Sequence, residues 1–159
     1  MMPPFVVFPT NRIAHFVEVS KKNPDAIICA YPEYDESAPE HRVNGRVIAN
    51  AWIHTVTLSK QIKDGMIGFR IYPVAPYVKL LNSHAIIDAR MGYDIDILVR
   101  LFWKNVPIIC ESVKVTYPVD GVSNFRVVRD NARISLTYAR LFLGMIVRLP
   151  ILIFRKIKG

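Results

Sequence analysis

The sequence has few cysteines, few acidic residues and no long uncharged apolar run, and each shortage excludes a class of protein. Two cysteines, Cys29 and Cys110, are too few for a disulfide scaffold or a cysteine-rich zinc site. Both lie in apolar runs, which favours buried free thiols and a reducing compartment. No run of about 18 apolar residues is free of charge, so no membrane-spanning helix is expected. The N-terminus also lacks the basic region of a signal peptide.

Acidic residues are scarcest in the last third of the chain. Residues 101–159 carry 10 Lys and Arg against 3 Asp and Glu, while the net charge of the whole chain is +8. Such an imbalance indicates an anionic partner for the C-terminal part, either membrane phosphate or nucleic acid. With 52% hydrophobic residues the chain is too apolar to be disordered as a whole.

Helical and strand patterns alternate along the chain. Helices are expected at 11–23, 42–62, 74–82, 93–104 and from 126 to about 147. Strands are expected at 25–32, within 106–118, and, as a short strand, after the two glycines of 63–73. This alternation predicts the α/β class. Three or four strands are too few for a complete doubly wound sheet.

The segment HRVNGRVIANAWIHTVTLSKQIKDGMIGFRIYP resembles the C-terminal half of a family 2 glycosyltransferase, nearest to the polyprenyl-phosphate mannose synthase-like branch. The Asp-x-x-x-GFR-x-Tyr element of that family corresponds to Asp64, Gly68, Phe69, Arg70 and Tyr72. A second segment, YDIDILVRLFWKNVPIICESVKVTYP, also resembles the pattern of this glycosyltransferase family. Residues 118–145 resemble the tail of bacterial members found beside acyltransferases in lipid and aryl-polyene gene clusters.

The resemblance covers roughly residues 12–150 and implies a partial GT-A-like (Rossmann-like) three-layer α/β fold. Residues 1–125 would form the acceptor-side part of a glycosyltransferase domain. Residues 126–159 would form a basic amphipathic tail at a membrane interface.

Family members carry an N-terminal half that binds the sugar nucleotide through an Asp-x-Asp motif and a divalent metal. No such motif precedes Glu18, the first acidic residue of this chain. Asp94 and Asp96 have the spacing of an Asp-x-Asp motif. They lie at an expected helix start, however, where the positive end of the helix dipole favours carboxylates. The resemblance therefore implies that Mg²⁺ or Mn²⁺ enters only with a separate N-terminal half, so we expect no metal and no cofactor in this chain. The four histidines show no metal-ligand spacing either.

The resemblance implies that Asp64 is the catalytic residue, as general base or as a positioning group. It also implies that Arg42, Arg46, Arg70 and Arg100 bind substrate phosphate. Arg42 and Arg46 lie one helical turn apart and can grip a phosphate together.

Each assignment has a structural alternative. Arg42 and Arg46 could form a solvated basic face or pair with the acidic loop at 33–40. Asp64 could serve turn chemistry beside a glycine, Arg70 could be a strand-edge charge, and Arg100 could pair with Asp96 one turn back on its helix.

The C-terminal segment predicts a basic amphipathic helix. At about 100° per residue, five arginines share an arc of roughly 100°: Arg126, Arg129, Arg133, Arg140 and Arg148. With Arg126 set at 0°, apolar residues lie at roughly 60–160° around the helix: Val127, Ile134, Leu141, Phe142 and Met145. This pattern is typical of a helix in a membrane interface with its arginines at lipid phosphates. Alternatively, the apolar face covers the core of the domain.

Together these features predict a peripheral protein on the cytoplasmic side of a membrane. By resemblance, the ancestral reaction transfers a sugar from a nucleotide sugar to a polyprenyl-phosphate or lipid-linked acceptor. The chain is expected to be incomplete as an enzyme by itself, with a separate N-terminal half or a second copy as partner. Nucleic acid is not expected, because the basic stripe continues into an apolar run. The alternative is a non-catalytic membrane-surface or complex-forming module derived from a glycosyltransferase.

Overall fold

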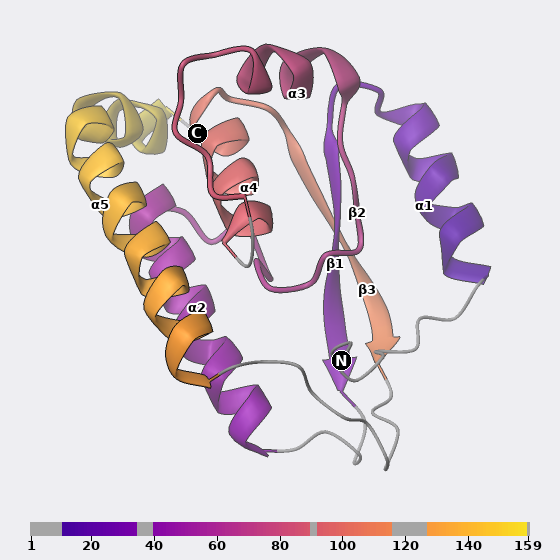
Figure 1. Cartoon of the computed structure of the whole chain (residues 1–159). Coiled ribbons are helices and arrows are strands. Elements are labelled where there is room, and N and C mark those ends of the chain that lie inside the picture. Colours follow the sequence, from indigo (N-terminus) through magenta and orange to yellow (C-terminus); the bar gives the residue numbers. More distant parts are fainter. Residues whose placement is uncertain (1–10, 35–39, 90–91, 116–126, 159) are drawn as a thin grey trace.

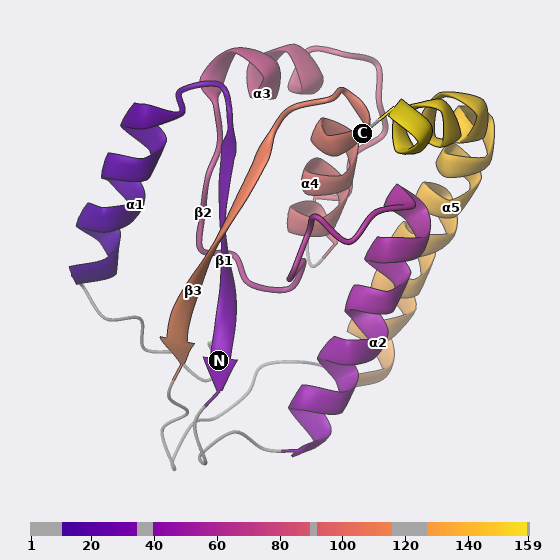
Figure 2. The same ribbon diagram turned by 180° about the vertical axis from the view of Figure 1, so that it is seen from behind.

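A three-stranded sheet forms the centre of the fold and is flanked by helices on both faces (Figures 1 and 2). The computed structural model describes residues 11–34, 40–89, 92–115 and 127–158. The strand order is β2-β1-β3, with β1 (Ile27–Tyr34) parallel to β3 (Ile108–Val115) and antiparallel to β2 (Arg70–Ile71). The expected α/β class is confirmed.

Alternating residues of the strands serve two separate cores. Ile28 and Ala30 point with Val113 toward Phe16 of α1 (Asn11–Lys22), which covers one face of the sheet. Ile27 and Cys29 belong to the larger core on the opposite face. Because β1 is buried from both sides, its first four residues have no exposed surface, as is typical of a strand in a parallel sheet.

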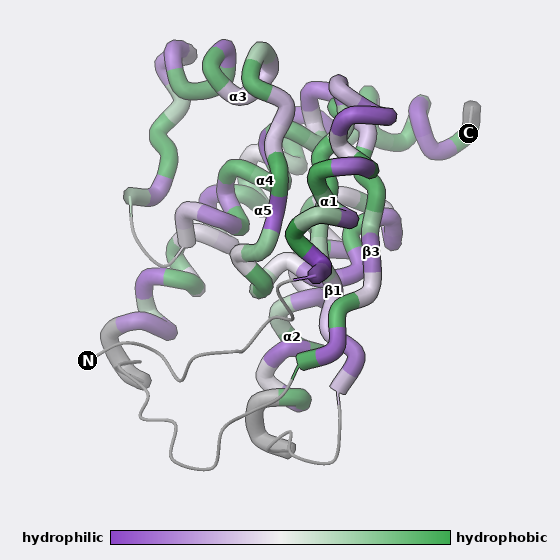
Figure 3. The backbone as a smooth tube through the Cα atoms, turned by 90° about the vertical axis from the view of Figure 1, so that its right-hand side faces the viewer, coloured by the Kyte–Doolittle hydropathy of each residue, from purple (hydrophilic) through white to green (hydrophobic). Residues whose placement is uncertain are grey.

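The larger core lies between the sheet and three helices, α2 (Glu40–Thr57), α4 (Tyr93–Trp103) and α5 (Val127–Lys158). Apolar side chains at helical spacing, such as Leu98 and Leu101 of α4, turn one face of each helix inward. Two buried hydrogen bonds fasten the helices together, from Trp103 Nε1 to the Val56 carbonyl (3.0 Å) and from Tyr138 Oη to the Ala49 carbonyl (3.1 Å). A short helix, α3 (Val74–Leu81), lies at the periphery and carries hydrophobic positions of its own (Figure 3).

One expected helix ends earlier than the sequence pattern predicts. The helix expected at 42–62 ends at Thr57, because Leu58 adopts a left-handed conformation with φ 52° that cannot continue an α-helix. The short strand expected after the two glycines of 63–73 is confirmed at Arg70 and Ile71, and Asp64 holds the preceding residues in a turn. The predicted turn at 118–125 lies outside the described residues.

The last helix differs most from expectation. It continues through Pro150 to Lys158 instead of ending near residue 147, and its final part runs in a new direction (Figure 1), as expected where proline removes a backbone hydrogen bond. The face expected to enter a membrane, with Leu141 and Met145, packs into the larger core instead. For these residues the alternative arrangement, in which the apolar face covers the core of the domain, is confirmed.

The composition of α5 also departs from the expectation that no segment could span a bilayer. Asp130–Ile157 has the length and composition of a membrane-spanning helix, with a mean hydropathy of 1.7 in its most apolar stretch. Of that stretch, 28% is buried within the fold. The buried side contacts α2 and α4, so α5 lies along the domain.

Candidate functional site

Asp64 is the centre of a buried polar cluster between α2 and the turn that follows it. Its side chain is 1% exposed and accepts hydrogen bonds on both oxygens. Arg46 Nη1 donates to Oδ1 and Oδ2, each at 3.1 Å, and Asn50 Nδ2 donates to Oδ2 at 3.3 Å. The backbone N–H groups of Met66 and Ile67 both donate to Oδ1 at 2.8 Å. Asp64 therefore joins the turn to the helix.

The same bonds limit what Asp64 can do chemically. A general base needs a free lone pair within reach of the proton that it accepts. Five hydrogen bonds already occupy the two carboxylate oxygens. In this arrangement Asp64 positions Arg46 and the 64–67 turn, which agrees with the positioning role that was one of its two expected roles.

Arg70 lies on β2 opposite Cys29, between the sheet and α4. Its Nη1 donates to Tyr72 Oη (3.2 Å) and to the backbone carbonyl of Asp94 (2.8 Å). Burial disfavours the charged form, but Tyr72, Cys29 and Asp94 outweigh it, so the pKa of Arg70 is raised. Its Nε and Nη2 are buried without a hydrogen-bond partner, which leaves binding capacity for an anion.

Tyr72, the partner of Arg70, packs against Tyr77, with ring centroids 5.4 Å apart. Burial raises the pKa of Tyr72, so its hydroxyl is neutral at pH 7. Tyr77 and Tyr93 share a short hydrogen bond between their hydroxyls, and this bond raises the pKa of Tyr93 to about 12. Tyr72 and Tyr93 therefore act as neutral hydrogen-bonding groups.

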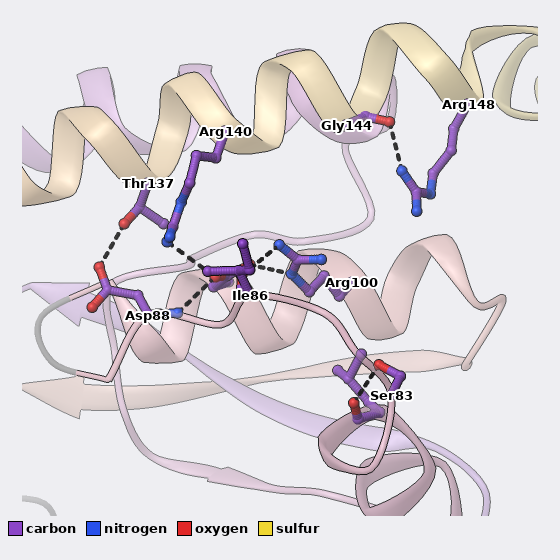
Figure 4. A network of polar contacts seen from close by, with 10 residues as sticks. Ser83, Ile86, Asp88, Arg100, Thr137, Arg140, Gly144 and Arg148 are labelled. Carbon is purple, nitrogen blue, oxygen red and sulfur yellow. Dashed lines mark hydrogen bonds and ion pairs between the residues drawn. The ribbon is translucent and has the colours of Figure 1, made fainter.

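Arg100 belongs to a different cluster, centred on Asp96 of α4. Figure 4 shows Arg100, Arg140 and Asp88 in this cluster. Asp96 is fully buried, pairs with Arg100 through Nε, and accepts from Arg140 Nη2 of α5 (3.5 Å) and from the backbone N–H of Asp88 (2.9 Å). The alternative pairing expected for Arg100 is thus confirmed as a contact. Asp96 joins α4 and α5, whereas Asp94 is exposed, so the two carboxylates point apart.

The arginines of the C-terminal helix lie mostly against the domain. Arg148 stacks over the ring of Trp103 at 4.7 Å from its centroid and donates to the Gly144 carbonyl (2.8 Å). Arg133 and Arg140 are half-buried. Arg126 and the side chains of Arg129 and Arg42 lie outside the described part of the chain.

The structure thus brings Arg46, Asn50 and Asp64 into contact and places Arg100 elsewhere. Sequence reasoning missed the bond between Arg140 and Asp96, because 44 residues separate them and no local spacing signals such a pair. It also missed the tyrosine pair. In the described residues no group of three or more His, Cys, Asp or Glu side chains could hold a metal ion.

Comparison with known proteins adds no relative. No family model, no curated protein and no solved structure matches this chain. The function is therefore inferred from the residues and their geometry.

Proposed function

We propose that this chain works at a membrane surface, as a module derived from the acceptor-side half of a GT-A-like family 2 glycosyltransferase domain. The observation that carries the membrane part is an apolar surface along the outer sides of α2 and α5. We call it the outer apolar strip, and it comprises Val47, Ile48, Trp52, Leu136, Phe142, Leu143, Ile146, Val147 and Ile153.

The outer apolar strip is continuous across the two helices. Trp52 of α2 contacts Tyr138 and Phe142 of α5, with ring centroids 6.0 and 6.4 Å away. Val147 is 79% exposed and Leu143 64% exposed. Apolar patches of this kind mark sites of protein or membrane contact.

A lipid surface fits the charges that flank the strip. Within 131–154 the only charged residues are Arg133, Arg140 and Arg148, and these contact the domain or lie half-buried beside it. Arg155, Lys156 and Lys158 follow at the C-terminal end of the helix. An apolar face bounded by basic residues is typical of helices that lie in the headgroup region of an anionic membrane.

The chemistry of the site favours a non-catalytic role for the chain alone. Asp64 has no free oxygen for a substrate hydroxyl, and its cluster serves the turn. A catalytic role is the second candidate, and two observations favour it. Among the described residues no strand pairs with the outer edge of β3, which offers a place for the sheet of an N-terminal half. The two unpartnered nitrogens of Arg70 could then receive the phosphate of a lipid acceptor.

Vesicle co-sedimentation tests the membrane proposal. The parent protein should bind anionic vesicles, bind neutral ones more weakly, and lose affinity as salt rises. The variant Leu143→Gln/Val147→Gln should lose most of this binding. The matched control Val74→Gln/Ile86→Gln removes two equally exposed apolar residues elsewhere and should bind like the parent.

Two outcomes would count against the proposal. Binding by the Leu143→Gln/Val147→Gln variant equal to the parent would show that the strip does not face lipid. Retention of the protein on membranes after an alkaline carbonate wash would show that α5 spans the bilayer, and peripheral association would be wrong.

A further inference from the structure

A pocket of about 860 Å³ opens at the end of the sheet where β3 begins. It lies between the C-terminal ends of α2 and α4, the residues that lead into β3, and the last turns of α5. Its volume falls in the range of pockets that hold small molecules. Asp64, Arg46 and Arg70 do not line it, so it is separate from the cluster around Asp64.

The lining of this pocket is basic. Lys60, Arg155 and Lys156 contribute three positive charges, and no acidic residue lines the pocket. The C-terminal ends of α2 and α4 oppose these charges with about half a negative charge each. At the end of α4, Arg155 pairs with the negative helix terminus by donating a hydrogen bond to the Trp103 carbonyl (3.0 Å). The C-terminal end of α5, whose last turns also line the pocket, contributes a similar negative charge. Between about one and two positive charges remain, so the pocket favours an anion.

Half of the ten remaining lining residues are apolar. Leu58, Phe102, Val106, Pro107 and Leu152 provide this part. Leu152 lies on the final part of α5, between Ile151 and Ile153, which are exposed. The pocket therefore adjoins the same helix whose outer side forms the outer apolar strip, and an apolar chain on that side could continue into it.

The backbone at the pocket is held in an uncommon conformation. Leu58 and Asn105 are the non-glycine residues with positive φ among the described residues, at 52° and 64°, and both line the pocket. A positive φ is disfavoured for a bulky side chain such as that of Leu58. These two residues end α2 and α4, and the space between the helix ends and α5 is the pocket.

We propose that this pocket binds the headgroup of an anionic phospholipid drawn from the membrane, with phosphatidate as the best match. A phosphate monoester carries up to two negative charges, which fits the remaining charge of the pocket. The acyl chains of the lipid would extend from the pocket along its apolar lining residues toward α5. This proposal rests on the membrane association proposed above and names the lipid that the surface selects.

A soluble short-chain lipid tests the pocket without a membrane. Dihexanoyl phosphatidate should bind the full chain at least about tenfold more tightly than glycerol 3-phosphate or inorganic phosphate, because only the lipid reaches the apolar lining. Lys60→Gln/Lys156→Gln should weaken this binding by about tenfold or more. The control Lys21→Gln/Lys22→Gln removes the same charge from exposed positions on α1 and should change it little. Thermal melting of each variant verifies folding.

Equal binding of the parent and the Lys60→Gln/Lys156→Gln variant would overturn the proposal, and so would equal binding of the lipid and glycerol 3-phosphate. Vesicles separate this failure from failure of the membrane proposal. The parent should prefer phosphatidate vesicles to phosphatidylserine vesicles of matched surface charge. Lys60→Gln/Lys156→Gln should bind both alike. Leu143→Gln/Val147→Gln should lose most of its binding to both kinds of vesicle yet still bind the short-chain lipid. Loss of short-chain binding in that last variant, with its fold intact, would contradict a separate pocket.

Discussion

Arg46 places a single nitrogen, Nη1, 3.1 Å from both carboxylate oxygens of Asp64. The carboxylate is almost fully buried, whereas the side chain of Arg46 is 18% exposed. Backbone N–H groups of the turn also donate hydrogen bonds to the carboxylate of Asp64. The Arg46–Asp64 pair therefore connects α2 to the turn that leads into β2. The geometry thus assigns a positioning role to the residue that the family resemblance marks as catalytic.

Replacing Asp64 should therefore destabilise the fold. Asp64→Asn removes the charge opposite Arg46 and turns an N–H group toward donors, which should lower the free energy of unfolding by about 2–4 kcal/mol. Urea denaturation measures this. The exposed Asp25→Asn should change stability by less than about 0.5 kcal/mol. A value that small for Asp64→Asn would mean that the pair contributes nothing to the fold.

Two glycines test how α5 packs on α4. A Cβ on Gly144 would lie 2.9 Å from Cη2 and 3.1 Å from Cζ3 of Trp103, whereas a Cβ on Gly45 meets no atom within 4 Å. Gly45→Ala should stabilise the protein by about 0.5–1 kcal/mol, because alanine favours a helix. Gly144→Ala should destabilise it by about 1–3 kcal/mol through overpacking. Melting temperatures that rise for both variants would contradict the packing of Trp103 under α5.

Cys29 predicts a loss of stability at high pH. Burial raises the pKa of this thiol from 9.0 to about 12. Between these values the unfolded chain releases the proton while the folded protein keeps it, so the stabilisation is complete below pH 9 and is lost as the pH rises toward 12. Cys29→Ala should flatten this part of the stability curve. A parent and variant with parallel curves from pH 8 to 11 would contradict it.

The helices and the two long strands could be predicted because apolar residues recur at periods that local geometry imposes. The i, i+4 pair of Asp96 and Arg100 was foreseeable for the same reason. The contacts of Arg46 with Asp64 and of Arg140 with Asp96 span 18 and 44 residues, and only the folded chain reveals them. Two arrangements of the apolar face of α5, against a membrane or against the core, stayed open because both sides of this helix are apolar. Periodicity identifies an apolar face but not what covers it.

The isolated chain should show no turnover of nucleotide sugars, with or without Mg²⁺ or Mn²⁺. A metal normally stabilises the leaving diphosphate in this chemistry, and the described residues offer no cluster that could hold one. Product formation from radiolabelled nucleotide sugars and a polyprenyl phosphate measures this. Transfer above the level of a boiled sample would establish catalysis by the chain alone.

The depth of Trp52 in a bilayer tests the central claim most directly. The chain has two tryptophans: Trp52 on the outer apolar strip is 44% exposed, and Trp103 in the core is 7% exposed. With vesicles of brominated anionic lipids, the parent should show a blue shift and strong quenching of its fluorescence. Trp52→Phe, in which only Trp103 emits, should bind the same vesicles with little quenching. Equal quenching of parent and variant, or vesicle binding without any quenching of Trp52, would show that the outer apolar strip does not lie in the membrane.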